Sequence, residues 1–84
     1  MSQETIGRYI IRDPGICHGE PTFRGTRIMV RQVLQQVAAG MAWETIIQEW
    51  RGSIERDAIA EAVRLASQAF AEHAHEYVVE PAAP

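Results

Sequence analysis

The feature that most constrains the fold is a change of hydrophobic period at Val30. From this residue onward, apolar side chains recur at intervals of three and four, which places them on one face of a helix. These positions are Val30, Val33, Leu34, Val37 and Ala38. Gly40 follows as a stop signal, because glycine readily adopts the left-handed conformation that ends many helices. The pattern predicts a first helix over residues 30–39.

A second apolar stripe predicts a second helix over residues 43–50. The stripe consists of Trp43, Ile46, Ile47 and Trp50. Both tryptophans are expected in the core; the alternative is that Trp43, near the start of its helix, is half exposed and contacts a partner protein. Arg51, Gly52 and Ser53 then interrupt the pattern with a tight turn, and Ser53 is the expected N-cap of the next helix.

A third helix is predicted over residues 54–77, with Ile59, Val63, Ala66 and Phe70 as its apolar positions. Residues 78–84 are predicted to be a flexible tail, because Pro81 and Pro84 cannot continue a helix. The length of the turn between the second and third helices is typical of a helix-turn-helix unit.

The residues before the first helix, 8–29, are rich in turns and short β-prone runs. The run Arg8–Arg12 is the first of these, and the Asp-Pro-Gly step after it breaks the strand. Thr22–Phe23 is expected to pair with residues 27–29 across a three-residue turn, in which Gly25 supplies the left-handed geometry.

Together these elements predict one mainly α domain over residues 1–84, a three-helix bundle with a short N-terminal β element. A core of this size is marginal, and oligomerisation is a common remedy. A single cysteine excludes an internal disulfide, and the start of the chain has no apolar run of the kind found in signal peptides. No stretch of apolar residues is long enough to span a membrane. We therefore expect a cytoplasmic protein without a membrane partner.

Charge is distributed unevenly along the chain. The net charge is −3, unlike that of basic proteins that bind nucleic acid without specificity. Residues 1–31 hold five arginines against three acids, a net charge of +2, whereas residues 32–84 hold three arginines against eight acids, a net charge of −5. The basic group that stands out is Arg24, Arg27 and Arg31. These arginines either contact nucleic-acid phosphate or pair with acids of the chain or of a partner.

In the helix-turn-helix interpretation, the third helix reads DNA with its first exposed side chains. These are expected to be Glu55, Arg56, Asp57 and Glu61. Three of the four are acids, which repel phosphate, so Arg56 is the expected DNA contact on this helix.

Neither a metal site nor an active site is predicted. Cys17 and His18 are adjacent, and His73 and His75 are two residues apart, whereas ligand pairs on a helix lie three or four apart. Cys17 is instead expected to be a small buried apolar residue. The chain has no Ser-His-Asp set, phosphate loop or paired carboxylates, so we expect no enzymatic activity and no cofactor.

The run from Asp13 to Trp50 resembles the small bacterial domain-of-unknown-function family numbered 433. The resemblance covers roughly residues 9–67 and is carried by a Gly-x-Pro step followed by Gly-Thr-Arg-Ile. The matching positions include Gly19, Pro21, Gly25, Thr26, Ile28, Val30 and Gly40.

The chain departs from the family pattern at three places. His18 stands where the family commonly has glycine, and Ala42 stands where a serine or threonine cap is usual. Loss of such a cap costs about 1 kcal/mol. The sequence Trp-Arg-Gly-Ser at residues 50–53 replaces the usual aromatic-proline step before the third helix.

The resemblance implies a homeodomain-like fold and the role of an antitoxin in a toxin–antitoxin pair. The partner toxin would be a ribonuclease of the PIN-like kind, and a homodimer would bind the promoter DNA of its own operon. The dimer would be joined through the N-terminal β element or the third helix. The alternative is a structural or protein-interaction module without a nucleic-acid function, which the acidic pI of about 5.5 favours.

Overall fold

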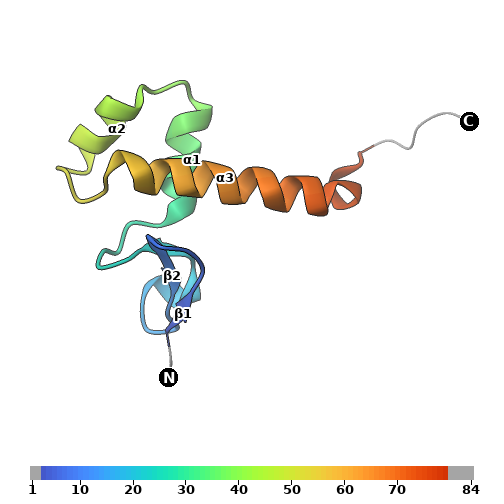
Figure 1. Ribbon diagram of the computed structural model, residues 1–84, viewed down its shortest axis with the longest axis horizontal. Helices are drawn as coiled ribbons and strands as arrows, with labels where there is room; N and C mark the ends of the chain where they lie inside the picture. The colour runs from blue at the N-terminus through green and yellow to red at the C-terminus, as the bar shows by residue number, and fades with distance from the viewer. Residues whose placement is uncertain (1–2, 80–84) are drawn as a thin grey trace, which may run out of the picture.

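The computed structural model describes residues 3–79 and confirms a mainly α domain with a short N-terminal sheet (Figure 1). The helices are α1 (Val30–Ala38), α2 (Trp43–Glu49) and α3 (Arg56–Glu72), and the strands are β1 (Glu4–Thr5), β2 (Ile10–Arg12) and β3 (Thr22–Phe23). Two 3-10 helices complete the fold, η1 (Cys17–Gly19) and η2 (Ala74–Tyr77). α3 crosses α1, and α2 and the sheet lie on opposite sides of α3 in this view. Within residues 3–79, no helix is long and apolar enough to cross a membrane.

The sheet is antiparallel with the order β1-β2-β3, so β2 is the central strand. Ile10 and Ile11 are 2% and 1% exposed, which means that both faces of β2 are covered. β1 is not predicted from the sequence, because its two residues are polar and exposed. An ion pair supports the pairing of β1 with β2. Glu4 lies opposite Arg12, and their charged groups are 3.1 Å apart.

The expected hairpin around the Arg-Gly-Thr turn is reduced to a single bridge between Thr22 and Met29. The main partner of β3 is β2, in a register that places Phe23 opposite Ile10. This pairing buries the Phe23 ring, which is 2% exposed, in the core. Thr22 is fully buried as well, and within the described residues its hydroxyl finds no hydrogen-bond partner.

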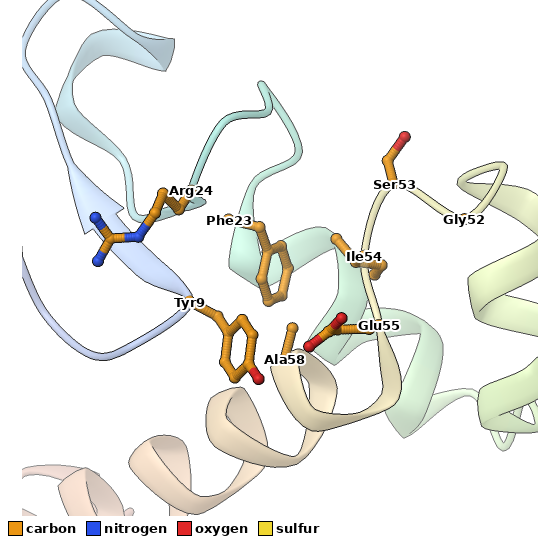
Figure 2. Close-up of a pocket in the computed structure, with 8 residues that line it drawn as sticks. All are labelled: Tyr9, Phe23, Arg24, Gly52, Ser53, Ile54, Glu55 and Ala58. Carbon is orange, nitrogen blue, oxygen red and sulfur yellow. The ribbon is translucent and has the colours of Figure 1, made fainter.

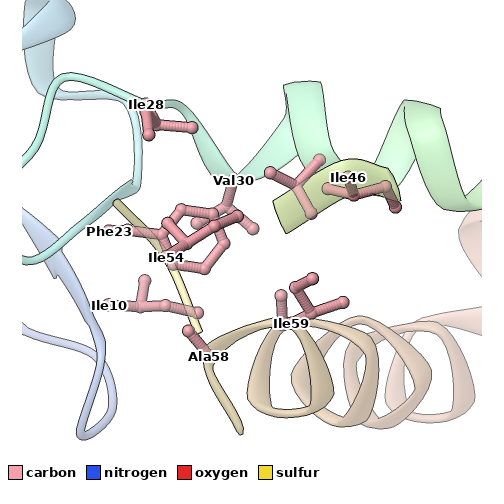
Figure 3. Close-up of a cluster of buried hydrophobic side chains, with 10 residues drawn as sticks. Ile10, Phe23, Ile28, Val30, Ile46, Ile54, Ala58 and Ile59 are labelled. Atoms are coloured by element: carbon pink, nitrogen blue, oxygen red, sulfur yellow. The ribbon is translucent and has the colours of Figure 1, made fainter. Parts of the chain in front are cut away.

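Side chains from the sheet, the connections and all three helices meet in one apolar core (Figure 3). The members are Ile10, Phe23, Ile28, Val30, Val33, Ile46, Ile54, Ala58, Ile59 and Ala62. Burying a large apolar side chain contributes about 1.5–3 kcal/mol. The stripe predicted for the first helix supplies Val30 and Val33, while Leu34 and Val37 pack against the rim of the core.

α1 and α2 are joined by a polar junction as well as by apolar contacts. Trp50 is half-buried, and its indole N–H donates to Gln36 Oε1 at 2.7 Å. The Gln36 side chain in turn donates to Glu49 Oε1 at 3.1 Å. Trp43 is half-buried too, so the expectation that both tryptophans lie in the core holds only for part of each ring.

α3 begins later than the sequence predicts. Its N-cap is Glu55 rather than Ser53, because Ile54 reaches the core from the connection before the helix and is 3% exposed. α3 ends at Glu72, and η2 occupies the last residues of the predicted helix. Residues 80–84 of the predicted tail lie outside the described part of the chain.

The second half of α3 projects beyond the rest of the domain (Figure 1). α3 has 17 residues and α1 has 9, so at about 1.5 Å per residue α3 is nearly twice as long as the helix it crosses. Ala66 and Phe70 were predicted on the packed stripe, but both are exposed, and Phe70 is 58% exposed. The first part of the predicted stripe is buried, as Ile59 shows. The later positions are exposed because α3 extends beyond the elements that cover its start.

Glu61 is buried, which corrects the expectation that it is an exposed residue of the third helix. Its side chain is 9% exposed and accepts two backbone hydrogen bonds, from Arg8 N–H at 3.0 Å and from Tyr9 N–H at 2.8 Å. A Cβ atom at Gly7 would lie 2.6 Å from the same carboxylate, so only glycine fits there without displacing it. Glu61 therefore fastens the β1–β2 loop to α3.

We predict that Glu61→Gln lowers the free energy of unfolding by about 2 kcal/mol, because hydrogen bonds to a charged acceptor are worth about 1.5–3 kcal/mol and the amide would turn a donor toward one N–H. Chemical denaturation measures the change, and amide hydrogen exchange should accelerate at Arg8 and Tyr9. Glu72→Gln on the exposed end of α3 is the matched control and should stay within about 0.5 kcal/mol. Equal stability of the two variants would contradict the anchoring role.

Candidate binding surfaces

The residues that carry the family resemblance all have structural roles. Gly19, Gly25 and Gly40 have φ values of 83°, 78° and 83°, which favour glycine. The Thr26 hydroxyl donates to the Phe23 carbonyl at 2.8 Å and accepts from Ile28 N–H at 3.0 Å, which closes the turn. The remaining positions, Pro21, Ile28 and Val30, start α1: the Pro21 carbonyl accepts from Val30 N–H at 2.9 Å, and both apolar side chains are buried. The motif therefore builds the scaffold and does not by itself form a site.

The turn around η1 holds two residues other than glycine in the left-handed region. Cys17 and His18 have φ values of 50° and 58°. This geometry costs a side-chain-bearing residue about 1–2 kcal/mol, so the glycine common in the family would suit position 18 better. Cys17 is half-buried, and its thiol donates to the Arg27 carbonyl at 3.4 Å. Within residues 3–79, no three potential ligand side chains come together as a metal site would need.

Arg24 is the first of the predicted DNA contacts, and the structure gives it an internal task. Its Nε donates to the Arg8 carbonyl at 3.1 Å and its Nη2 to the Gly7 carbonyl at 3.4 Å. The same two peptide units donate their N–H groups to Glu61. Each unit is thus held at its carbonyl by a cation and at its N–H by an anion. Arg24 completes the anchor of the β1–β2 loop.

The other predicted contacts do not gather around Arg24. Arg31 at the start of α1 pairs with Glu20 at 3.3 Å. Arg56 pairs with the Glu44 carboxylate, and its guanidinium lies 5.2 Å from the centre of the Trp43 ring. Arg27 is exposed, and no ion pair involves it within the described residues. These pairs lie on separate elements.

The most exposed apolar surface belongs to the C-terminal arm, which we define as residues 66–79. Every residue of the arm is exposed. Phe70 and Tyr77 are 58% and 59% exposed, and their ring centres lie 5.3 Å apart. Val78 and Val79 continue the apolar surface with exposed fractions of 60% and 99%. Monomeric proteins rarely expose a contiguous apolar surface of this kind without a binding role.

The charge of the arm is acidic. It contains Glu72 and Glu76 and has neither lysine nor arginine. Glu76 is close to both neighbouring histidines, with His73 Nδ1 at 3.0 Å and His75 Nε2 at 3.8 Å. The arm therefore combines two exposed aromatic rings with carboxylates and has no permanent cation.

A shallow cavity of about 210 Å³ lies between the sheet and the start of α3 (Figure 2). Its lining residues are Tyr9, Phe23, Arg24, Gly52, Ser53, Ile54, Glu55 and Ala58. Phe23, Ile54 and Ala58 form a buried apolar floor, since each is at most 3% exposed. The Glu55 carboxylate points into the cavity, whereas the Arg24 guanidinium points away from it. We call this the Tyr9–Glu55 cavity.

Glu55 changes the acidity of Tyr9. Hydrogen bonding to the Glu55 carboxylate is the main cause that raises the pKa of Tyr9 above its ordinary value, because it favours the protonated phenol. The Arg8 guanidinium, 5.4 Å from the centre of the Tyr9 ring, opposes the shift. The neutral phenol is therefore the form that the folded protein favours, and the stability that it contributes is lost as pH rises through the raised pKa.

Sequence reasoning missed Tyr9 and Glu61 as organising residues. A signal for Glu61 exists, because this acid sits between Ala58 and Ala62 in a small-residue run that must pack closely. The sequence does not show which groups Glu61 binds, because its partners are backbone N–H groups more than 50 residues away.

We predict that Glu55→Gln lowers the pKa of Tyr9, because a neutral amide stabilises the phenol less than a carboxylate does. An ultraviolet-monitored pH titration in a Tyr77→Phe background isolates the Tyr9 transition. Glu49→Gln, on the exposed face of α2, is the control and should leave it unchanged. A Tyr9 pKa that is the same in both variants would show that Glu55 does not hold the hydroxyl.

The model of the family described as "Protein of unknown function (DUF433)" matches residues 10–66. No significant match is found among curated proteins or among solved structures. The match includes the Gly-x-Pro and Gly-Thr-Arg-Ile steps and all three helices up to the exposed half of α3. The chain belongs to the DUF433 family.

Proposed function

We propose that this protein is an antitoxin-like binding protein that holds a partner toxin, a ribonuclease of the PIN-like kind, through its C-terminal arm. The observation that carries the proposal is the uncovered apolar surface of the arm, with Phe70 and Tyr77 side by side. The resemblance of the DUF433 motif to antitoxin-like proteins supplies the class of partner.

The shape of the arm suits insertion into a groove. Phe70 lies near the end of α3 and Tyr77 at the end of η2, and their neighbouring rings form one projecting aromatic surface that a groove can receive. Aromatic side chains are enriched among the residues that dominate binding energy, because each buries a large area at low entropic cost. A helix end that no other element covers is also a weak structure by itself, so a partner would stabilise it.

The charge of the arm favours a basic partner over a second copy of the chain. A two-fold contact between two arms would bring the carboxylates of Glu72 and Glu76 close to their counterparts, with no arginine in the arm to offset them. A ribonuclease that binds a phosphate backbone carries basic surfaces, which complement these carboxylates and speed association.

We predict that Phe70→Asp weakens toxin binding at least tenfold, because it removes a central aromatic anchor and places a charge where the contact is apolar. The measurement is calorimetry with the ribonuclease encoded in the neighbouring reading frame, together with rescue of growth on co-expression. Ala71→Asp, one residue further along and about 100° around the helix from Phe70, adds the same charge without removing the ring; it is the matched control and should bind normally. Both residues are exposed, so the fold should survive either change.

Unchanged affinity of Phe70→Asp would overturn the assignment of the arm. Light scattering, which measures the molar mass in solution, tests whether the arm binds a second copy of the chain. If Phe70→Asp converts a dimer into a monomer, it does. If no ribonuclease binds at all, the protein is better described as an interaction module of another kind.

Promoter DNA is the second proposed partner, and the accessibility of Arg27 and Arg31 supports it. Arg27 is exposed, and the Arg31–Glu20 pair is exposed enough to be worth about 0–1 kcal/mol, so phosphate can compete for both arginines. Arg24 is a weaker candidate because it holds two backbone carbonyls. A homodimer would present the set twice.

We predict that Arg27→Ala weakens binding to the upstream DNA of its own gene and reduces the salt dependence of the binding constant by about one counterion. Gel-shift titrations at several salt concentrations measure both quantities. Arg12→Ala, which removes an exposed pair with Glu4, is the control and should have little effect. Absence of binding even at low salt would end the DNA half of the proposal.

A further inference from the structure

We propose that the Tyr9–Glu55 cavity is a second contact site, which takes up one arginine or lysine side chain of a partner protein. The identity of that partner as a toxin rests on the proposed function. The chemistry of the cavity does not, and it can be tested without any toxin.

The cavity has the dimensions of a site for a single side chain. Its volume of about 210 Å³ is below the range of about 300–1,000 Å³ that is usual for complete small-molecule ligands. The floor is apolar and rigid, because Phe23, Ile54 and Ala58 belong to the core. A preformed pocket of this kind can receive an anchor side chain without ordering new parts of the chain.

The polar groups of the cavity select a cation. Glu55 points its carboxylate into the cavity that Tyr9 also lines, and a carboxylate offers several acceptor positions to a donor (Figure 2). Asp57 adds negative charge at Tyr9, against the positive charge of Arg8, whose guanidinium lies 5.4 Å from the centre of the Tyr9 ring. The guanidinium of Arg24 is held on the loop carbonyls and turned away from the cavity.

The second neighbouring arginine is also engaged elsewhere. Arg56 pairs with Glu44 and lies over the Trp43 ring on the side of α2. Glu55 is therefore left without a cationic partner from its own chain among the described residues.

A long basic side chain satisfies both parts of the cavity at once. Its methylene groups can lie on Phe23 and Ile54, while its charged end reaches Glu55 at the rim. Arginine fits best, because its planar head can donate two hydrogen bonds to one carboxylate. A glutamate or aspartate side chain would meet Glu55 as a like charge.

The first test uses Nα-acetyl-arginine amide as a probe of the isolated protein. In heteronuclear NMR titrations we expect saturable shifts at the amides of Tyr9, Ser53 and Ile54, with a Kd in the millimolar range. The neutral citrulline analogue, which has nearly the same shape, should bind at least fivefold more weakly. Glu55→Gln should lose the preference for arginine, and Glu49→Gln should keep it. Equal shifts with arginine and citrulline, or an unchanged preference in Glu55→Gln, would overturn the site.

The second test separates this site from the arm. If the cavity receives a side chain of the toxin, Glu55→Gln weakens toxin binding severalfold while Ala71→Asp does not. If Phe70→Asp abolishes toxin binding and Glu55→Gln leaves it intact, the toxin does not use the cavity, and the proposed function still stands. If no toxin binds to the unmodified protein, the proposed function fails, and the arginine titration still decides the cavity.

Discussion

The structure depends on one buried carboxylate. Glu61 accepts the N–H groups of Arg8 and Tyr9, and Arg24 holds the carbonyls of the same peptide units from the other side. An unpaired charge would be costly at this depth, and it is offset by the two hydrogen bonds and by the Arg64 guanidinium, 3.8 Å from the carboxylate. Because both ends of each peptide dipole are held, the β1–β2 loop has a fixed position on α3. That position fixes where Tyr9 lies, and Tyr9 forms one wall of the cavity. It also fixes where the central strand β2 begins.

Hydrophobic period alone predicted the three helices, because each buries an apolar stripe and the helical spacing of that stripe is visible in the sequence. It could not predict where the stripe of α3 loses its cover, since that depends on the relative lengths of α1 and α3 in space. Ser53 looked like a cap because of its type, yet Ile54 is needed in the core, and the helix starts after it. Glu61 was misread because a charged residue was assumed to face solvent or a partner, whereas the donors that it needs are backbone N–H groups remote in the sequence. The backbone carbonyls that Arg24 contacts are remote in the sequence as well.

The family motif and the C-terminal arm occupy different parts of the molecule. The motif glycines, Thr26 and Pro21 shape the path from β3 into α1. The family match ends at residue 66, where the C-terminal arm begins, and it starts one residue after Tyr9. Membership in DUF433 therefore accounts for the scaffold. The C-terminal arm proposed to hold the toxin lies almost entirely beyond the match, whereas Arg27, Arg31 and Glu55 lie inside it. The homeodomain-like likeness and the homodimer remain predictions.

The buried hydroxyl of Thr22 is a local cost to stability that is independent of the small size of the domain. A hydroxyl removed from water without a partner costs about 1–3 kcal/mol. Valine has nearly the same shape and would need no partner, so one exchange of oxygen for a methyl group would release that amount. Thr22→Val is therefore a way to stabilise this scaffold for engineering. Because residue 22 is fully buried, the substitution leaves the surface of the protein unchanged.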